Sequence, residues 1–321
     1  MADILNNMIP VKRAGRQTVI FSSPPAIISS ATVVGPMEGK GPLGSYFDTV
    51  LKDDTWGEES WEKAERKMFE QSVRKAMDKV NLQGGGVDCL LGGDLLNQII
   101  SANFAARELK LPFLGLYGAC STMAESLLIG SMLIDGGYAG RVACVATSHF
   151  STAERQYRSP LEMGGQTTPT AQRTVTGAGC SIAANPSLEG DRLYGNIFVT
   201  AGTIGKVTDL GITDANNMGA AMAPAAADTL AAHLSDTGRG IMDYDLIVTG
   251  DLGSFGSEMF RELCLQNGMD IGNRHLDCGN LIFSGEQKAD CGGSGCGCCA
   301  SVLNAYLLER IEKGELRRIF F

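Results

Sequence analysis

Short apolar runs alternate with amphipathic stretches along most of this chain, a pattern that is typical of an α/β protein. Strands are predicted where β-branched and apolar residues form a short run bounded by glycine or proline. In the first part of the chain such runs lie at 17–21, 26–34, 87–91, 114–117, 141–147 and 174–184. Helices are predicted where apolar residues recur at helical spacing between charged residues, at 55–80, 94–109 and 121–134.

The second part of the chain repeats this order of strands and helices. Strands are predicted at 193–199, 246–249 and 316–321, and helices at 224–234, 254–265 and 300–313. Two parts with a similar β-α-β order suggest a duplication with a shared core. We therefore expect an N-terminal half, residues 1–186, and a C-terminal half, residues 187–321.

The stretch from 114 to 147 reads as strand, turn, helix and strand, with Cys120 in the turn. Thr122 and Glu125 have the spacing of a capping box, which places the start of the helix near Cys120. A thiol in the first turn of a helix faces free backbone N–H groups and the positive end of the helix dipole, and both stabilise a thiolate. The spacing alone leaves two interpretations open: a nucleophile, or a small buried apolar residue.

Composition and charge exclude several classes of function. The formal net charge is −9, which argues against binding nucleic acid or an anionic membrane through a basic patch. The N-terminus shows no secretory signal, and no run of 18 apolar residues predicts a membrane-spanning helix. We therefore expect the ten cysteines to be free thiols, most of them buried.

Three motifs in the same order resemble those of thiolases and β-ketoacyl synthases. They are the cysteine turn Gly118–Thr122, the glycine-rich strand Thr176–Ser181, and the glycine-rich turn Gly293–Ser301 before the last long helix. The resemblance implies a thiolase-like α/β fold. In that fold two duplicated βαβαβ halves pack as a five-layered αβαβα structure.

A closer resemblance covers the chain from about residue 18 to its end. Gly93–Gln98, Gly164–Gln172 and Gly292–Cys298 are similar to segments of the stage V sporulation protein AD family, which is related to β-ketoacyl synthase III. The resemblance implies a protein of spore-forming bacteria that binds dipicolinic acid. It further implies a part in moving this acid, as its calcium chelate, into the developing spore.

The resemblance also shows what is missing for catalysis. Condensing enzymes of this superfamily hold the oxyanion with two further donors, usually two histidines or a histidine and an asparagine. The first would follow the strand at 246–249, where this chain has Gly250 and Asp251, and a carboxylate repels an oxyanion. The second would lie near Cys296, and no histidine or asparagine occurs between Asp290 and Ser301. We therefore expect no catalysis, with Cys120 as a vestigial nucleophile.

The three histidines and the C-terminal cysteines offer other chemistry. His149 follows a predicted strand, so it either faces the pocket or is a hydrogen-bonded polar residue at a strand end. His233 is predicted to be structural, and His275 has no role that the sequence indicates. Cys296 and Cys299 have C-x₂-C spacing, but a structural zinc site needs a second ligand pair. We therefore expect no metal held by the protein.

Dipicolinate is a flat pyridine with two carboxylates, so its pocket needs N–H or cationic donors and a flat wall. The start of the helix at Cys120 offers N–H groups for one carboxylate. An arginine of the segment 148–174 would bind the other, and Asp251 would face a chelated calcium ion. The candidate ligand-binding residues are Cys120, Ser121, His149, Arg155, Arg158, Arg173, Asp251 and Cys296. For each arginine, a solvated surface position is the alternative.

Three functions remain open at this point. The leading one is a non-catalytic binding protein that acts with membrane-bound subunits of a dipicolinate transport assembly, peripheral at the inner spore membrane. The second is an active acyl-transferring enzyme that uses Cys120, and the third is a scaffold without a ligand. The resemblance also implies a homodimer, and family members continue beyond Phe321 with a segment that could close the pocket.

Overall fold

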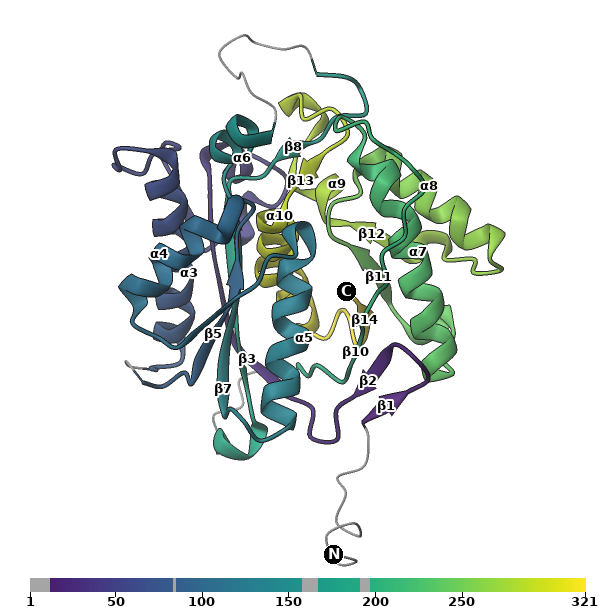
Figure 1. Ribbon diagram of the computed structural model, residues 1–321, viewed down its shortest axis with the longest axis horizontal. Helices are drawn as coiled ribbons and strands as arrows, with labels where there is room; N and C mark the ends of the chain where they lie inside the picture. Colours follow the sequence, from purple (N-terminus) through teal and green to yellow (C-terminus); the bar gives the residue numbers. More distant parts are fainter. Residues whose placement is uncertain (1–11, 83–84, 158–166, 191–196) are drawn as a thin grey trace, which may run out of the picture.

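The computed structural model describes residues 12–82, 85–157, 167–190 and 197–321 and arranges them in alternating layers of helices and sheets (Figure 1). The largest sheet has six strands in the order β4-β3-β9-β7-β5-β6. Their bounds are Ala26–Val34 for β3, Thr49–Val50 for β4, Cys89–Gly93 for β5, Phe113–Gly115 for β6, Arg141–Ser148 for β7 and Gly177–Ala184 for β9. Strands β6 and β7 both run parallel to β5, and β9 runs antiparallel to β3 and β7.

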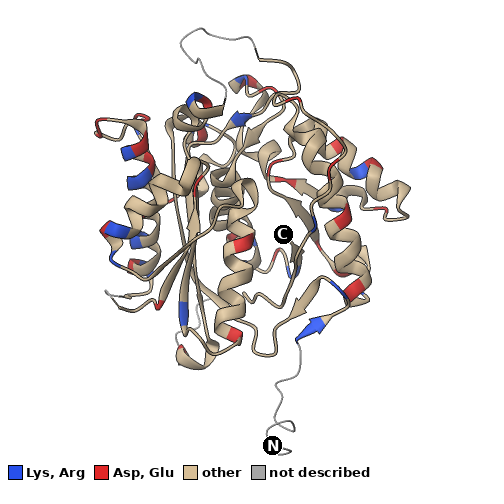
Figure 2. Ribbon diagram, viewed as in Figure 1, with Lys and Arg blue, Asp and Glu red and all other residues tan. Residues whose placement is uncertain are grey.

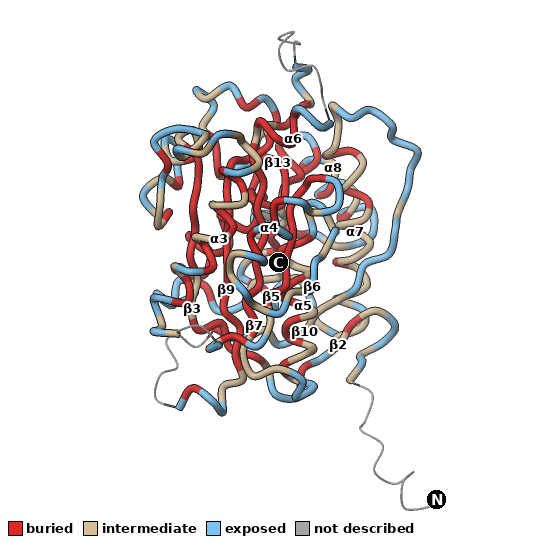
Figure 3. Tube along the Cα trace, turned by 60° about the vertical axis from the view of Figure 1, so that its left-hand side comes forward, coloured by how far each residue is buried: buried red, intermediate tan, exposed pale blue. Residues whose placement is uncertain are grey.

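Both faces of this sheet are buried, as alternation along β7 shows. Val142 and Cys144 belong to the cluster that includes α5 (Thr122–Asp135) and α10 (Cys296–Val302). Ala143 and Val145 belong to the opposite cluster, with α3 (Trp61–Lys79) and α4 (Ile100–Leu109). The central strands are accordingly buried along most of their length (Figure 3). This explains why β7 is apolar from Val142 to Ala146 instead of alternating with polar residues.

A second sheet lies beyond α5 and α10. It has three parallel strands in the order β12-β11-β14, with bounds His275–Asp277 for β12, Leu246–Thr249 for β11 and Ile319–Phe320 for β14. Val248 of β11 joins the central cluster, whereas Ile247 packs with α7 (Met218–Thr237) and α8 (Gly253–Gln266). The layers are therefore α3/α4, the large sheet, α5/α10, the second sheet, and α7/α8.

Shorter elements connect these layers. Strands β1 (Arg13–Ala14), β2 (Thr18–Ile20) and β10 (Ala201–Thr203) form an antiparallel sheet, and β8 (Arg173–Thr174) pairs with β13 (Gly293–Ser294). The remaining helices are α2 (Pro36–Gly39), α6 (Phe150–Tyr157), α9 (Cys278–Ile282) and α11 (Leu308–Glu312), and a π-helical turn at Leu303–Leu307 joins α10 to α11. Charged residues lie mainly on the outer helices, and α10 carries none (Figure 2). No helix in the described ranges has the length and apolar character needed to cross a bilayer.

The structure corrects several predicted helix starts. The helix predicted from 55 begins at Trp61, because the Ser60 side chain caps it by accepting a hydrogen bond from the N–H of Lys63. The helix predicted from 94 begins at Ile100, because Asp94 and the residues after it form a turn. The capping box at Thr122 was wrong, since a 3₁₀ turn leads directly into α5 and no side chain caps it.

The structure confirms some of the remaining predicted strands and helices. The strand at 246–249 is confirmed with its bounds, and the predicted helices of the C-terminal part lie within α7, α8 and the run from α10 to α11. The strand predicted at 193–199 falls largely outside the described residues. The proposed boundary between 186 and 187 stays a prediction.

Candidate functional site

The turn that carries Cys120 lies between β6 and α5. Ala119 adopts a left-handed backbone conformation, with φ of 48°, which is uncommon for a residue with a side chain. A 3₁₀ turn at Ala119–Ser121 follows, and α5 begins at Thr122. Cys120 as a whole residue is partly exposed, while its sulfur points into dense surroundings. The predicted position of the thiol at the start of a buried helix is therefore confirmed.

Asp251 approaches the same place from the second sheet. It follows β11 and is buried, with an exposed fraction of 4%. Its Oδ2 accepts a hydrogen bond of 2.7 Å from the N–H of Gly295, and its backbone carbonyl accepts one of 2.6 Å from Nε2 of Gln172. The carboxylate is thus held by the glycine-rich turn, and its main chain is tied to the segment before β8.

The Cys120 thiol donates a hydrogen bond to the Asp251 carboxylate. Burial raises the pKa of the Cys120 thiol well above its usual range, and the negative charge and hydrogen bond of Asp251 raise it further. Burial also raises the pKa of Asp251, while the contact with the thiol and the N–H of Gly295 lowers it. Although the start of a helix favours a thiolate, Cys120 is protonated at neutral pH.

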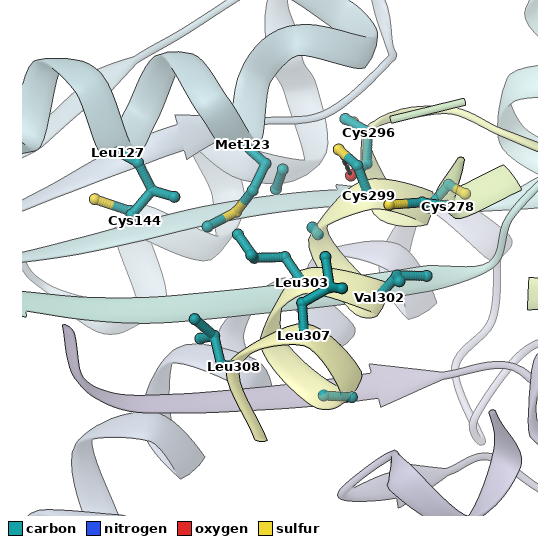
Figure 4. Close-up of a cluster of buried hydrophobic side chains, with 14 of the residues drawn as sticks. Met123, Leu127, Cys144, Cys278, Cys296, Cys299, Val302, Leu303, Leu307 and Leu308 are labelled. Carbon is teal, nitrogen blue, oxygen red and sulfur yellow. Dashed lines mark hydrogen bonds between the residues drawn. The ribbon is translucent and has the colours of Figure 1, made fainter. Parts of the chain in front are cut away.

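Two more cysteines surround this pair from α10. The Cys296 thiol donates to the carbonyl of Thr147 at 2.9 Å, and the Cys299 thiol lies 3.5 Å from the carbonyl oxygen of Cys120. Figure 4 shows Cys296 and Cys299 on the first turns of α10, with Cys278 beside them, whereas Met123 of α5 extends toward Leu303. Burial raises the pKa of both α10 thiols, so they too are neutral.

The floor of the site is made of closely packed backbone. Gly295 has a φ of 94°, which disfavours any residue with a side chain. A Cβ atom at Gly297 would lie 2.4 Å from the carbonyl oxygen of Gly177 and 2.5 Å from Oγ of Ser148. That same hydroxyl accepts a hydrogen bond from the N–H of Gly297 at 3.1 Å. The turn therefore disfavours side chains at both positions, by its backbone conformation at Gly295 and by collision at Gly297.

His149 is buried and uses both ring nitrogens within the protein. Its Nε2 lies 2.7 Å from the carbonyl oxygen of Asp54, and its Nδ1 accepts a hydrogen bond from the N–H of Ser151. The ring therefore carries its proton on Nε2 and donates it to Asp54. Burial lowers the pKa of His149, which keeps the ring neutral. Its contacts agree with the second interpretation, a hydrogen-bonded polar residue at a strand end.

The arginines of segment 148–174 make contacts away from Cys120. Arg155 is exposed, forms an ion pair with Glu62 and lies over the ring of Trp61. The Arg173 guanidinium stacks on Phe150 at 3.6 Å from the ring centroid. Arg158 lies outside the described residues. Neither of the two described arginines is directed toward Cys120 by these contacts.

The structure thus brings together Cys120, Asp251 and Cys296, and leaves Ser121 exposed beside them with its hydroxyl donating to Gly118 at 2.9 Å. Sequence reasoning missed Cys299 as a member of the site. Its distance of three positions from Cys296 was a usable signal, because such residues share one face of a helix. In the described part of the chain, no group of three or more histidine, cysteine or acidic side chains is arranged to hold a metal ion.

Comparison with known proteins decides the family. The model of the stage V sporulation protein AD (SpoVAD) family matches residues 15–321. The chain belongs to this family. A curated relative, stage V sporulation protein AD of Bacillus subtilis (strain 168), is 45% identical over 310 residues, which cover 97% of this chain and 90% of the relative. The chain is therefore a sporulation protein.

Solved structures establish the fold. A single-residue variant of OleA from Xanthomonas campestris has a TM-score of 0.62 at 15% identity, covering 92% of each chain. The 3-oxoacyl-[acyl-carrier-protein] synthase III of Aquifex aeolicus VF5 has a TM-score of 0.55 at 15% identity, covering 92% of this chain and 94% of the synthase. The predicted thiolase-like fold is confirmed. At this level of identity the similarity establishes nothing about the reaction.

Proposed function

We propose that this SpoVAD family member is a non-catalytic protein that binds dipicolinic acid at the Cys120 site and supports its uptake into the developing spore. The observation that carries the non-catalytic part is the contact between Cys120 and Asp251. A nucleophilic thiol must ionise, and a buried carboxylate beside it opposes ionisation. The same carboxylate would also repel the oxyanion of an acyl-transfer reaction.

The histidines do not supply the missing base or oxyanion donor. His149 donates to Asp54, as described above. His233 lies between Thr203 and Tyr244, and His275 bonds to Thr249. With all three engaged away from the thiol, acyl transfer at Cys120 lacks a partner.

The same geometry favours the calcium chelate over the free acid as ligand. Dipicolinate is a dianion, and the buried Asp251 carboxylate would repel it. A calcium ion between the two would be attracted to both, because calcium prefers carboxylate oxygens. The first N–H groups of α5 offer a complementary site for a ligand carboxylate. We therefore propose that Asp251 faces the metal and that the start of α5 faces the acid.

Arg173 is the candidate for a second anchor. Its Nε atom is buried and has no hydrogen-bond partner among the described residues. The carboxylates of Glu38, Glu154 and Asp54 lie near enough to offset part of the pKa lowering that burial causes in Arg173. Consecutive residues of an extended segment point to opposite faces, so Arg173 faces away from the side where Gln172 meets Asp251. The Arg173 side chain would therefore contact the proposed ligand from the side that faces away from the Cys120 turn.

We further propose a homodimer that associates with membrane-bound subunits at the inner spore membrane. Strand β6 is an edge of the large sheet and exposes Leu114, with an exposed fraction of 52%. Beside it, Ile100 and Phe104 of α4 and Tyr117 after β6 are also exposed. An exposed apolar sheet edge favours pairing with another chain.

Calorimetry with dipicolinate, with and without equimolar calcium, tests the binding function. We expect binding that is stronger with calcium and that Cys120→Trp, which fills the site, abolishes. Cys89→Ala, at a partly exposed cysteine on β5, serves as the control and should bind as the parent does. Absence of binding to the parent protein would contradict the proposal.

Incubation with acyl-CoA, followed by mass spectrometry of the intact protein, tests the alternative enzyme function. We expect no acyl adduct at Cys120. A stoichiometric thioester at this residue would instead favour an active condensing enzyme.

A further inference from the structure

The three strands of the second sheet begin at one edge of the protein, because β11, β12 and β14 run parallel. Their register places Arg274 on one side of the start of β11 and Arg318 on the other. On the β14 side, the N–H of Asp245 donates to the carbonyl of Arg318 at 2.8 Å. Neighbouring strands are about 4.8 Å apart, so the two arginines are attached to backbones about 10 Å apart. This edge is opposite to the Cys120 site, since Asp251 follows the other end of β11.

Two more arginines lie next to these strand starts. Arg239 belongs to the connection between α7 and β11, and its guanidinium donates to the hydroxyl of Tyr244 at 3.1 Å. Arg317 comes directly before Arg318, and both residues are exposed. The four residues that we call the arginine edge are therefore Arg239, Arg274, Arg317 and Arg318.

The guanidinium groups of the arginine edge keep most of their hydrogen-bond donors unused. Arg274 donates to the carbonyl of Tyr244 at 2.7 Å, and Arg318 donates to that of Asp243 at 3.3 Å. The side chain of Arg317 makes no hydrogen bond with a described residue, and none of the four is ion-paired with a carboxylate in the described ranges. A guanidinium has five N–H donors, so most of these donors remain for an anion from outside the chain.

Three aspartates of the same turns carry negative charge, but their carboxylates hold backbone N–H groups. Asp245 accepts hydrogen bonds from the N–H groups of Arg317 and Arg318, at 2.7 and 2.9 Å. Asp243 and Asp270 each accept one from a glycine N–H of their own turn. The four arginines outnumber these acids, so the edge is locally positive on a chain whose net charge is −9. At the end of α7 and the turn after β1, two exposed arginines face one aspartate: Arg13, Arg16 and Asp236.

An apolar side chain projects from the middle of this edge. Met242 lies in the turn between Arg239 and Asp243, with an exposed fraction of 76%. An open groove of about 430 Å³ beside it is lined by Met242, Arg274 and residues 270–273. An acidic protein surface or a phosphate ion would match the arginines but leave the methionine without an apolar partner. A lipid surface offers both phosphates and an apolar layer beneath them.

We propose that the arginine edge docks this protein on an anionic lipid bilayer. The guanidinium groups bind lipid phosphates, and Met242 enters between the headgroups. Because Arg274 and Arg318 stand on opposite sides of β11, they suit separate headgroups better than a single phosphate ion. The Cys120 site then faces away from the bilayer. This contact goes beyond the proposed function, since neither dipicolinate nor another subunit takes part in it.

The net charge of the whole chain opposes such binding, so its strength should depend on salt. Near an anionic surface, each arginine strengthens binding by about fivefold at low ionic strength. The attraction is screened over about 8 Å at physiological ionic strength, whereas the more distant acidic groups are screened more completely. The positive edge therefore faces the bilayer while the rest of the chain is turned away from it.

Co-sedimentation of the full chain with two kinds of vesicle tests the proposal. One kind contains equal parts of phosphatidylglycerol and phosphatidylcholine, and the other contains phosphatidylcholine alone. We expect binding to the anionic vesicles at low ionic strength, release in high salt, and no binding to the neutral vesicles. A parent protein that does not bind the anionic vesicles, or that binds both kinds equally, would overturn the proposal.

Variants of matched charge separate the arginine edge from the charge of the whole chain. Arg317→Gln combined with Arg318→Gln should weaken binding to anionic vesicles by about 20-fold. Arg74→Gln combined with Arg107→Gln removes two charges from the outer helices α3 and α4 and should bind as the parent does. Equal losses in the two double variants would show that only net charge acts, and would overturn the proposal.

Two further measurements keep the test independent of folding and of free phosphate. Met242→Ser changes no charge and should weaken binding several-fold, which gives a second measure if the double variant unfolds. Full binding by Met242→Ser would contradict the insertion of this side chain. Inorganic phosphate should release the parent protein from vesicles no better than chloride does at equal ionic strength. A stronger release by phosphate would indicate a pocket for the ion and would overturn the lipid assignment.

Discussion

The thiol of Cys120 and the buried carboxylate of Asp251 come from opposite halves of the chain and form a hydrogen bond at the centre of the candidate site. The start of α5 alone would stabilise a thiolate at this position. The carboxylate reverses this stabilisation of the thiolate. It accepts a hydrogen bond from the neutral thiol, and its negative charge repels the ionised form. The reactivity of Cys120 therefore depends on a residue 131 positions further along the chain.

Replacing Asp251 should make Cys120 more reactive. Asp251→Asn removes the negative charge, so the pKa of the thiol should fall and its alkylation by iodoacetamide at pH 8 should become several-fold faster. Mass spectrometry of the peptide that contains Cys120 measures the rate without interference from the other cysteines. Asp290→Asn, at an exposed carboxylate of the same region, is the control. An equal or slower rate in Asp251→Asn would show that burial alone suppresses the thiolate.

Asp277 should be important for stability. Its carboxylate accepts hydrogen bonds from the N–H groups of Leu252, Gly253 and Asn280, at the starts of α8 and α9. Asp277→Asn replaces one acceptor by a donor, and we expect the free energy of unfolding to fall by about 1–3 kcal/mol. Urea denaturation measures the change. Asp270→Asn, an exposed residue that caps only its own turn, should cost far less, and equal losses would count against this role.

His233 should make the protein sensitive to mild acid. Burial lowers the pKa of His233 to about 4, whereas an unfolded histidine titrates near 6.5. The unfolded chain therefore binds a proton first, and stability should fall as the pH decreases from about 6.5 toward 4. His233→Gln should be less stable at pH 7 but show a flatter decline in acid. Thermal unfolding between pH 7 and 5 measures this, and parallel curves for the two proteins would contradict it.

The exposed edge of the large sheet should control self-association. Leu114→Asp places a charge on β6, and we expect it to convert a homodimer to monomers in sedimentation velocity at micromolar concentration. Met242→Asp, at a more exposed residue that lies away from this edge, is the control and should remain dimeric. A parent protein that sediments as a monomer would remove the dimer from the proposal.

The sequence predicted the layers well because apolar runs record burial directly. The buried strand β7 and helix α5 follow from their composition, and Cys120 follows from its place between them. The starts of α3 and α4 could not be predicted in the same way. They depend on Ser60, whose side chain caps the first turn of α3, and on Asp94, whose carboxylate holds a turn before α4 by bonding to the backbone.

Side-chain direction in the site was harder to predict than residue choice. The arginines of segment 148–174 were chosen for their charge, but Arg155 contacts Trp61 of α3, and Arg173 stacks on Phe150 of its own segment. The direction of the His149 side chain could not be predicted either, because its partner Asp54 belongs to a distant loop that no local pattern connects to it. Asp251 lies beside Cys120, and it was a family motif, not local periodicity, that drew attention to its position.

The backbone packing beneath the site also limits how this protein could evolve or be engineered. Gly295 has a left-handed backbone, and a side chain at Gly297 would collide with the carbonyl of Gly177, so neither position readily accepts a polar side chain; Cys296 and Asp251 stand where the oxyanion donors were expected. A return to acyl-transfer chemistry would therefore require changes at these two positions together. Either change alone would leave a polar group without a partner in a buried site. Few single substitutions toward that activity would therefore leave the stability of the protein unchanged.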